Sequence, residues 1–211
     1  MGNRGGLLLV FFCLEFFLGS LMFSYWLARG RGKDLRAVGD GNPGAVNLWR
    51  AAGWRWGLAG LLLDYLKGLL PLVCIAQRGL FSGMELALLA AAPVLGHAFS
   101  PFLKFSGGKA IAVAFGAWTA LTLWVVPVLM GGTFALFSLV GLLRRQESTP
   151  ERDVWRVSWG MAAALPYLLW LGDLSLLLFW VFSGAILFVK HQKEIKVLRE
   201  EHRMKKGGTY I

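Results

Sequence analysis

Long apolar stretches separated by short polar segments dominate this chain, and they predict its helices. Leu7 to Leu27 is apolar except for Glu15, and it is long enough to cross a bilayer and too long for the core of a signal peptide. Trp56 to Ala76 predicts a second helix, which carries two charged residues, and Met84 to about Phe99 predicts a short third one. These stretches place the chain in the all-α integral membrane class.

Two further apolar stretches are too long to be one helix each. Ala110 to Leu143 contains no charged residue, and as one helix it would be about 51 Å long against a hydrocarbon core of roughly 30 Å. Pro127 and the pair Gly131-Gly132 interrupt it, so we expect two helices there, the second of them short. Val157 to Val189 is expected to divide likewise at Gly172-Asp173, which gives seven transmembrane helices in total.

The basic residues test this helix count. The 211-residue chain has a formal net charge of +10, and seven spans would gather 19 of its 22 Lys and Arg on one side, in segments 28–55, 100–109, 144–156 and 190–211. Because such residues concentrate in cytoplasmic loops, we expect the N-terminus outside and the C-terminus in the cytoplasm, in a single domain covering residues 1–211. Little of the chain lies outside the apolar helices, so we expect no nucleic-acid partner.

Three polar segments carry the candidate chemistry, and seven spans would place all of them on the cytoplasmic face. They are residues 39–50, residues 96–109 and residues 190–195, and they are rich in Gly, Asn, His, Lys and Arg. Glycine exposes backbone N–H groups and basic side chains add positive charge, so together they suit a phosphate group. The segments therefore predict an enzyme or a binder of a phosphorylated molecule at the membrane surface.

The first segment offers backbone and side-chain donors. Gly41 and Gly44 allow the backbone to approach an anion closely. Asn42 and Asn47 can donate amide hydrogen bonds, and Arg50 can bind phosphate oxygens with two parallel bonds. The alternative is an ordinary Gly/Asn/Pro turn in which the arginine only marks the cytoplasmic side.

The second and third segments add a lysine and two histidines. Gly107, Gly108 and Lys109 precede an apolar helix, as in a phosphate-binding turn, although the spacing of a P-loop is absent. His97 and His191 suit phosphate binding or proton transfer; the alternatives are a helix cap for the first and a lipid-facing basic belt for the second.

One acidic and one basic residue also lie within the predicted second helix. Asp64 and Lys67 are one turn apart there, and the favoured interpretation is a pair that neutralises itself inside the membrane. A small transporter of an anion or lipid stays a competing hypothesis. The polar residues collect near one interface rather than at mid-bilayer, however, and this distribution favours surface chemistry.

The order of these motifs resembles the bacterial acyl-phosphate-dependent glycerol-3-phosphate acyltransferase family, whose members are small seven-helix membrane enzymes. The family's first motif, approximately G-S-G-N-x-G-A-T-N-x-x-R, matches GDGNPGAVNLWR at residues 39–50. Its D-x-x-K-G signature matches Asp64, Lys67 and Gly68. Its second motif appears as GHAFS at 96–100 and FSGGKAIAV at 105–113, and its third, H-R-x-N-I, as HQKEI at 191–195.

The chain departs from the family pattern at several motif positions. Asp40 and Val46 stand for serine and threonine, Ser106 and Ala110 for lysine and glycine, and Gln192 and Glu194 for arginine and asparagine. A carboxylate repels an anionic substrate unless the carboxylate is protonated or paired with a cation. A member with a changed acceptor or lost activity is therefore an alternative to the acyltransferase hypothesis.

The resemblance implies a complete reaction. A fatty acyl group would pass from acyl phosphate to the first hydroxyl of glycerol 3-phosphate, giving lysophosphatidic acid, at the cytoplasmic face of the bacterial cytoplasmic membrane. Acyl phosphate is already activated, so we expect no cofactor and no metal, and membrane lipid is the expected surrounding. The implied roles are phosphate binding for Arg50 and Lys109, hydrogen-bond donation for Asn42, Asn47, Gly107 and Gly108, and phosphate binding or proton transfer for His97 and His191.

Overall fold

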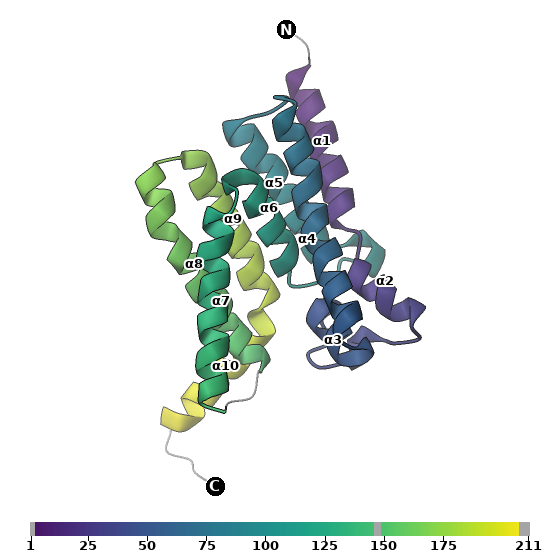
Figure 1. The fold of residues 1–211 in the computed structure, drawn as a ribbon, viewed down its shortest axis with the longest axis vertical. Coiled ribbons are helices and arrows are strands. Elements are labelled where there is room, and N and C mark those ends of the chain that lie inside the picture. The colour runs from purple at the N-terminus through teal and green to yellow at the C-terminus, as the bar shows by residue number, and fades with distance from the viewer. Residues whose placement is uncertain (1–2, 146–148, 207–211) are drawn as a thin grey trace.

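The computed structural model describes residues 3–145 and 149–206, and all of the regular secondary structure in these residues is helical. The start of α1 and the end of α10 lie at opposite ends of the molecule, and α3 lies toward the α10 end (Figure 1). The α-helices are α1 (Arg4–Gly19), α2 (Phe23–Gly30), α3 (Ala45–Ala52), α4 (Trp54–Gln77), α5 (Gly83–Ala98), α6 (Ile111–Thr122), α7 (Val125–Leu143), α8 (Pro150–Leu171), α9 (Leu174–Lys190) and α10 (Gln192–Lys206).

Four helical stretches of the described chain are long and apolar enough to cross a membrane. They are Arg4–Gly30, which comprises α1 and α2, then α4, Gly83–Leu103 and α7. The pair formed by α9 and Gln192–Glu200, bent by 63°, adds a fifth if it is one span. The all-helical membrane class is therefore confirmed, whereas the seven-span count and the orientation stay predictions.

The long apolar stretch from residue 110 to 143 divides at a different place from the one expected. The break falls at Leu123, whose φ is 54°, so α6 has 12 residues and α7 has 19. The expectation of a short second helix is therefore wrong, and the first is the short one. Pro127 lies in the first turn of α7, where backbone N–H groups have no helical partner, so it starts this helix rather than ending one.

The first predicted helix also contains a break, between Gly19 and Phe23. The carbonyls near this break accept hydrogen bonds from side chains of other segments: Ser100 Oγ donates to Ser20 O at 2.7 Å, and Lys67 Nζ donates to Leu21 O. Those bonds tie the end of α1 to α4 and to the segment after α5.

The predicted break between the last two apolar helices is confirmed. Gly172 ends α8 in the left-handed region with φ 65°, a conformation that glycine adopts without cost. Asp173 then caps α9 by accepting from the backbone N–H of Ser175 at 2.8 Å.

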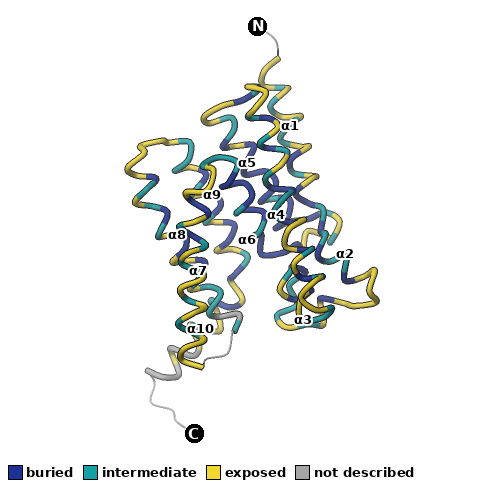
Figure 2. Tube along the Cα trace, in the orientation of Figure 1, coloured by how far each residue is buried: buried dark blue, intermediate teal, exposed yellow. Residues whose placement is uncertain are grey.

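The buried core lies where α4, α5, α6 and α9 meet. Trp118 on α6 is fully buried and packs on Phe179 of α9, with ring centroids 4.6 Å apart. A side chain at Gly116 would lie 2.1 Å from Tyr65 O, so glycine there allows α6 to pack directly on the backbone of α4. Many large apolar side chains are exposed, as expected of helices in lipid. Figure 2 shows exposed residues along the outer helices.

Candidate active site

A cavity of about 600 Å³ opens where the first two polar segments meet α4, α6, α7 and α8. Its walls are mostly apolar, with Leu61, Leu62, Phe115 and Phe134 among them. Six of the predicted site residues line it: Asn42, Gly44, Asn47, Arg50, His97 and Lys109. Gly41, Gly107, Gly108 and His191 are not among the lining residues; Gly41 adjoins Asp40 and Asn42 in the chain, and the other two glycines contact His97.

The loop before α3 is held together by side-chain hydrogen bonds. Asn47 is 1% exposed, and its Nδ2 donates to Asp40 Oδ1 at 2.8 Å and to the Asn42 carbonyl at 2.9 Å. The backbone N–H of Asn42 donates to the same Asp40 oxygen at 3.1 Å. Both asparagines therefore shape the loop, and Gly44 is the residue at which it turns into α3.

Arg50 extends from α3 to the cavity and is exposed to solvent. Its Nη1 donates to Asn47 Oδ1 at 3.2 Å, and within the described residues no carboxylate oxygen lies within 4.0 Å of it. Its positive charge is therefore available to an anion that enters the cavity.

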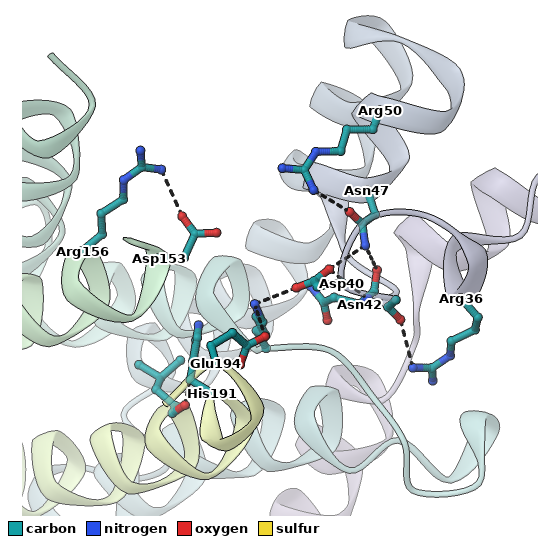
Figure 3. Close-up of polar contacts among 12 residues, drawn as sticks. Arg36, Asp40, Asn42, Asn47, Arg50, Asp153, Arg156, His191 and Glu194 are labelled. Carbon is teal, nitrogen blue, oxygen red and sulfur yellow. Dashed lines mark hydrogen bonds and ion pairs between the residues drawn. The ribbon is translucent and has the colours of Figure 1, made fainter. Parts of the chain in front are cut away.

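Lys109 is shared between two carboxylates from distant parts of the chain. Its Nζ lies 2.7 Å from Asp40 Oδ2 and 2.9 Å from Glu194 Oε1, and its side chain is 10% exposed. Figure 3 shows Asp40 in the loop before α3 and Glu194 on α10 facing each other across this contact. The two carboxylates that replace neutral family residues are thus both paired with a cation.

Burial and pairing act in opposite directions on this cluster. Burial disfavours the charge on Asp40, but the hydrogen bond and charge of Lys109 outweigh it and hold the pKa of that carboxyl below its ordinary value. Burial also disfavours the charge on Lys109, but hydrogen bonds to Asp40 and Glu194 outweigh it and raise the pKa of the lysine. Lys109 is therefore protonated, and its positive charge is already compensated by Asp40 and Glu194.

A second buried cluster lies deeper in the fold, and it confirms that Asp64 and Lys67 pair. Lys67 Nζ is 2.8 Å from Asp64 Oδ1 and 2.9 Å from His97 Nδ1, and Ser24 Oγ donates to Asp64 Oδ2 at 2.7 Å. Since an ammonium group only donates, His97 Nδ1 accepts, and the proton of the neutral ring belongs on Nε2. His97 thus presents an N–H donor on the side away from Lys67.

The two glycines of the second segment pack directly on this histidine. A side chain at Gly108 would lie 2.3 Å from His97 Nε2, and one at Gly107 would lie 2.0 Å from His97 O. The backbone N–H of Gly108 donates to His97 O at 3.0 Å. In this structure the glycines therefore position the ring, and the Gly108 amide already has a partner.

His191 lies at the junction of α9 and α10, beside Glu194 (Figure 3). It is 2% exposed, and its Nδ1 lies 2.7 Å from Leu187 O, which fixes Nδ1 as the protonated nitrogen of the neutral ring. Its Nε2 and Glu194 Oε2 are both buried without a hydrogen-bond partner in the part of the chain that the structure describes. The two histidines of the site are thus held in opposite tautomers.

Three charged residues near the cavity were missed by the sequence reasoning. Asp153 and Arg156 at the start of α8 line it and form an ion pair at 3.0 Å. Arg36 donates to Ser106 O and, at 3.3 Å, to Gly41 O, and so joins the first polar segment to the second. The α8 pair could have been predicted, because an acidic and a basic residue lie one helical turn apart in the sequence. No sequence pattern around Arg36 indicates its role.

Comparisons with known proteins agree on one family. A family model described as glycerol-3-phosphate acyltransferase matches residues 9–201. Glycerol-3-phosphate acyltransferase 1 of Thermotoga maritima is 44% identical over 87% of this chain and 93% of that protein. The glycerol-3-phosphate acyltransferase of Geobacter sulfurreducens is 36% identical over 93% of this chain and 97% of that protein.

Solved structures give the same result. The crystal structure of PlsY (YgiH), an integral membrane glycerol 3-phosphate acyltransferase, in its glycerol 3-phosphate form superposes with a TM-score of 0.77 at 28% identity, over 92% of both chains. The lysophosphatidic acid form of that protein gives a TM-score of 0.75 at 26% identity.

Proposed function

Because the chain belongs to the glycerol-3-phosphate acyltransferase family, we propose that it transfers a fatty acyl group from an acyl phosphate to the first hydroxyl of glycerol 3-phosphate. Membership makes the protein a multi-pass membrane acyltransferase of phospholipid biosynthesis. The acyl phosphate donor, the roles of single residues and the cytoplasmic location of the site are the parts that we propose.

The observation that carries the proposal is the combination of an apolar cavity with a polar end that holds both basic and acidic side chains. Leu61, Phe115 and Phe134 offer an apolar wall to an acyl chain, while Arg50 and Lys109 lie where phosphate groups would sit. A molecule with a long apolar tail and a phosphate head suits both parts at once. Water-soluble phosphates alone would leave the apolar wall unused.

The reaction requires that the two substrates are positioned correctly, and it does not require an activated nucleophile of the protein. The acceptor hydroxyl oxygen forms a bond to the acyl carbonyl carbon, the bond from that carbon to the phosphate oxygen breaks, and the hydroxyl proton ends on the released phosphate. Negative charge grows on the carbonyl oxygen and on the leaving phosphate during this step. The Nε2–H of His97 and the guanidinium of Arg50 are the donors that we assign to these oxygens.

We also propose that the cavity opens toward the cytoplasm. Segments 28–55, 100–109, 144–156 and 190–211 hold 19 of the 22 Lys and Arg, and the three polar segments overlap the first, second and last of them. Positive residues are retained on the cytoplasmic side. Labelling of single cysteines in closed cells would test this, since labels at Arg50 and at Lys193 should both require a membrane-permeant reagent.

The function is tested by acyl transfer with Arg50→Ala against Arg55→Ala. Both arginines are exposed, but only Arg50 lines the cavity. Losing one charge-assisted hydrogen bond of about 1.5 to 3 kcal/mol should lower kcat/KM by roughly 10- to 150-fold in Arg50→Ala, with Arg55→Ala close to wild type. Phosphate release that does not depend on glycerol 3-phosphate, or equal rates for both variants, would contradict the proposal.

A further inference from the structure

We propose that Asp40 and Glu194 make this enzyme select its phosphorylated acceptor in the singly protonated, monoanionic form. The inference rests on the proposed function and adds the charge state of the substrate to it. It applies to the corner of the site formed by Lys109, its two carboxylates and His191, which we call the lysine corner.

The charge of the lysine corner is the first argument. Lys109 contributes one positive charge, and the carboxylates at 2.7 Å and 2.9 Å from its Nζ contribute two negative ones. An ammonium group has three N–H donors, and these contacts account for two of them. A dianionic phosphate would therefore meet a corner of net negative charge, whereas a monoanion meets half the repulsion.

The unused hydrogen-bonding atoms are the second argument. Glu194 Oε2 and His191 Nε2 are buried and have no partner in the described chain. Nδ1 of His191 donates its proton to Leu187 O, so Nε2 offers a lone pair. Both free atoms are acceptors, and a fully ionised phosphate brings no hydrogen for them.

A monoanionic phosphate supplies what the corner lacks. Its P–OH group can donate to a carboxylate of the corner, where Asp40 lines the cavity and Glu194 and His191 do not, while its charged oxygens accept from Lys109 and from Arg50. Since the second pKa of a phosphate ester is about 6, both ionic forms are present near neutral pH. The lysine corner then favours binding of the monoanion over the dianion.

Further titratable groups around the corner come from α8 and α3. Asp153 and Arg156 face it from α8 as an ion pair at 3.0 Å, and Arg50 faces the cavity from α3. Burial raises the pKa of Asp153 above its ordinary value, against the opposing charges of Arg156 and Lys109, so a protein group can also produce a pH dependence. The test must therefore distinguish the titration of the ligand from the titration of the protein.

The test measures the acceptor KM from pH 5 to 8.5, at saturating acyl phosphate, for three acceptors. They are glycerol 3-phosphate, its methylene phosphonate, whose second pKa is higher, and its difluoromethylene phosphonate, whose second pKa is lower. We expect KM to rise about tenfold per pH unit above a break that moves with the pKa of each acceptor. A break at the same pH for all three acceptors, or no rise at all, would overturn the inference.

Variants provide an independent readout. Asp40→Asn and Glu194→Gln keep the shape of both side chains and remove their charge. The double variant should keep its KM within about threefold from pH 6 to 8, because Lys109 can then accept a dianion. Asp34→Asn, a change at an exposed carboxylate that caps the turn beside Arg36, should keep the wild-type rise.

The two hypotheses fail in different ways. If no acceptor gives acylated product at any pH, the proposed function is wrong. If transfer to glycerol 3-phosphate is normal and its KM does not follow the ionisation of the acceptor, only the selection of the monoanion is wrong.

Discussion

The contact between Gly108 and His97 gives the sharpest prediction about how the site works. A methyl group added by Gly108→Ala would lie 2.3 Å from His97 Nε2, 3.1 Å from Cδ2 and 3.3 Å from Cε1. Ordinary van der Waals contact begins at 3.4 Å, so the ring has to retreat by about 1 Å. The ring is 4% exposed and held by Lys67 at 2.9 Å, which leaves little room for it to move.

The displacement sets the size of the expected effect. A misplacement of about 1 Å in a catalytic group can cost about 100-fold in rate, which is about 2.7 kcal/mol of transition-state stabilisation. We therefore expect kcat/KM of Gly108→Ala to fall by about two orders of magnitude. Overpacking of this kind should also lower the stability by about 1 to 3 kcal/mol.

The assay follows phosphate release from acyl phosphate in the presence of glycerol 3-phosphate, with thermal unfolding of the same samples in detergent. The matched control is Gly132→Ala on α7, where an added methyl group meets no atom within 4 Å. That control should keep wild-type rates, since alanine suits a helix interior. A folded Gly108→Ala with wild-type kcat/KM would refute the assignment of His97 as a donor to the reacting oxygens.

Three other predictions follow from the charged clusters. Asp64→Asn or Lys67→Met alone should lower the unfolding free energy by about 3 to 5 kcal/mol, because each leaves one buried charge without its partner. The double variant should lose much less than the sum of the two single losses. Additive losses would show that the pair is not coupled. The lowered pKa of Asp40 means that its pairing with Lys109 stabilises the fold above the pKa of an unfolded aspartate, about 3.9, and that this stability is lost as pH falls through the folded value. The thermal midpoints of wild type and Asp40→Asn should therefore differ near neutral pH and converge in acid; a constant difference would contradict this. Arg36→Gln should lower kcat/KM about 3- to 10-fold with little change in the thermal midpoint, since the Arg36 guanidinium joins two loops at the surface. Wild-type kinetics would show that this connection between the loops is unimportant for activity.

Sequence reasoning was most accurate where the physical signal is local. Helix-breaking chemistry at Gly172-Asp173 predicted the end of α8, because a left-handed glycine followed by a capping aspartate is sufficient by itself. The same reasoning misplaced the break within residues 110–143. Pro127 lies in the first turn of α7, where proline is compatible with a helix, and the actual break at Leu123 has no glycine or proline to indicate it. The pairing of Asp64 with Lys67 was also predictable, because residues one turn apart share a helix face.

The sequence by itself determined the all-helical membrane class, and it picked out the first two polar segments, which line the cavity, because hydrophobicity and motif spacing are properties of single stretches. Only the tertiary structure decided that Asp40 and Glu194 meet on one lysine, that the two histidines hold opposite tautomers, and that Arg36 joins two loops. In a membrane protein, lipid and core are both apolar, so hydrophobic periodicity does not report which helix faces touch each other. Contacts between residues far apart in the chain therefore had to come from the packing of the helices.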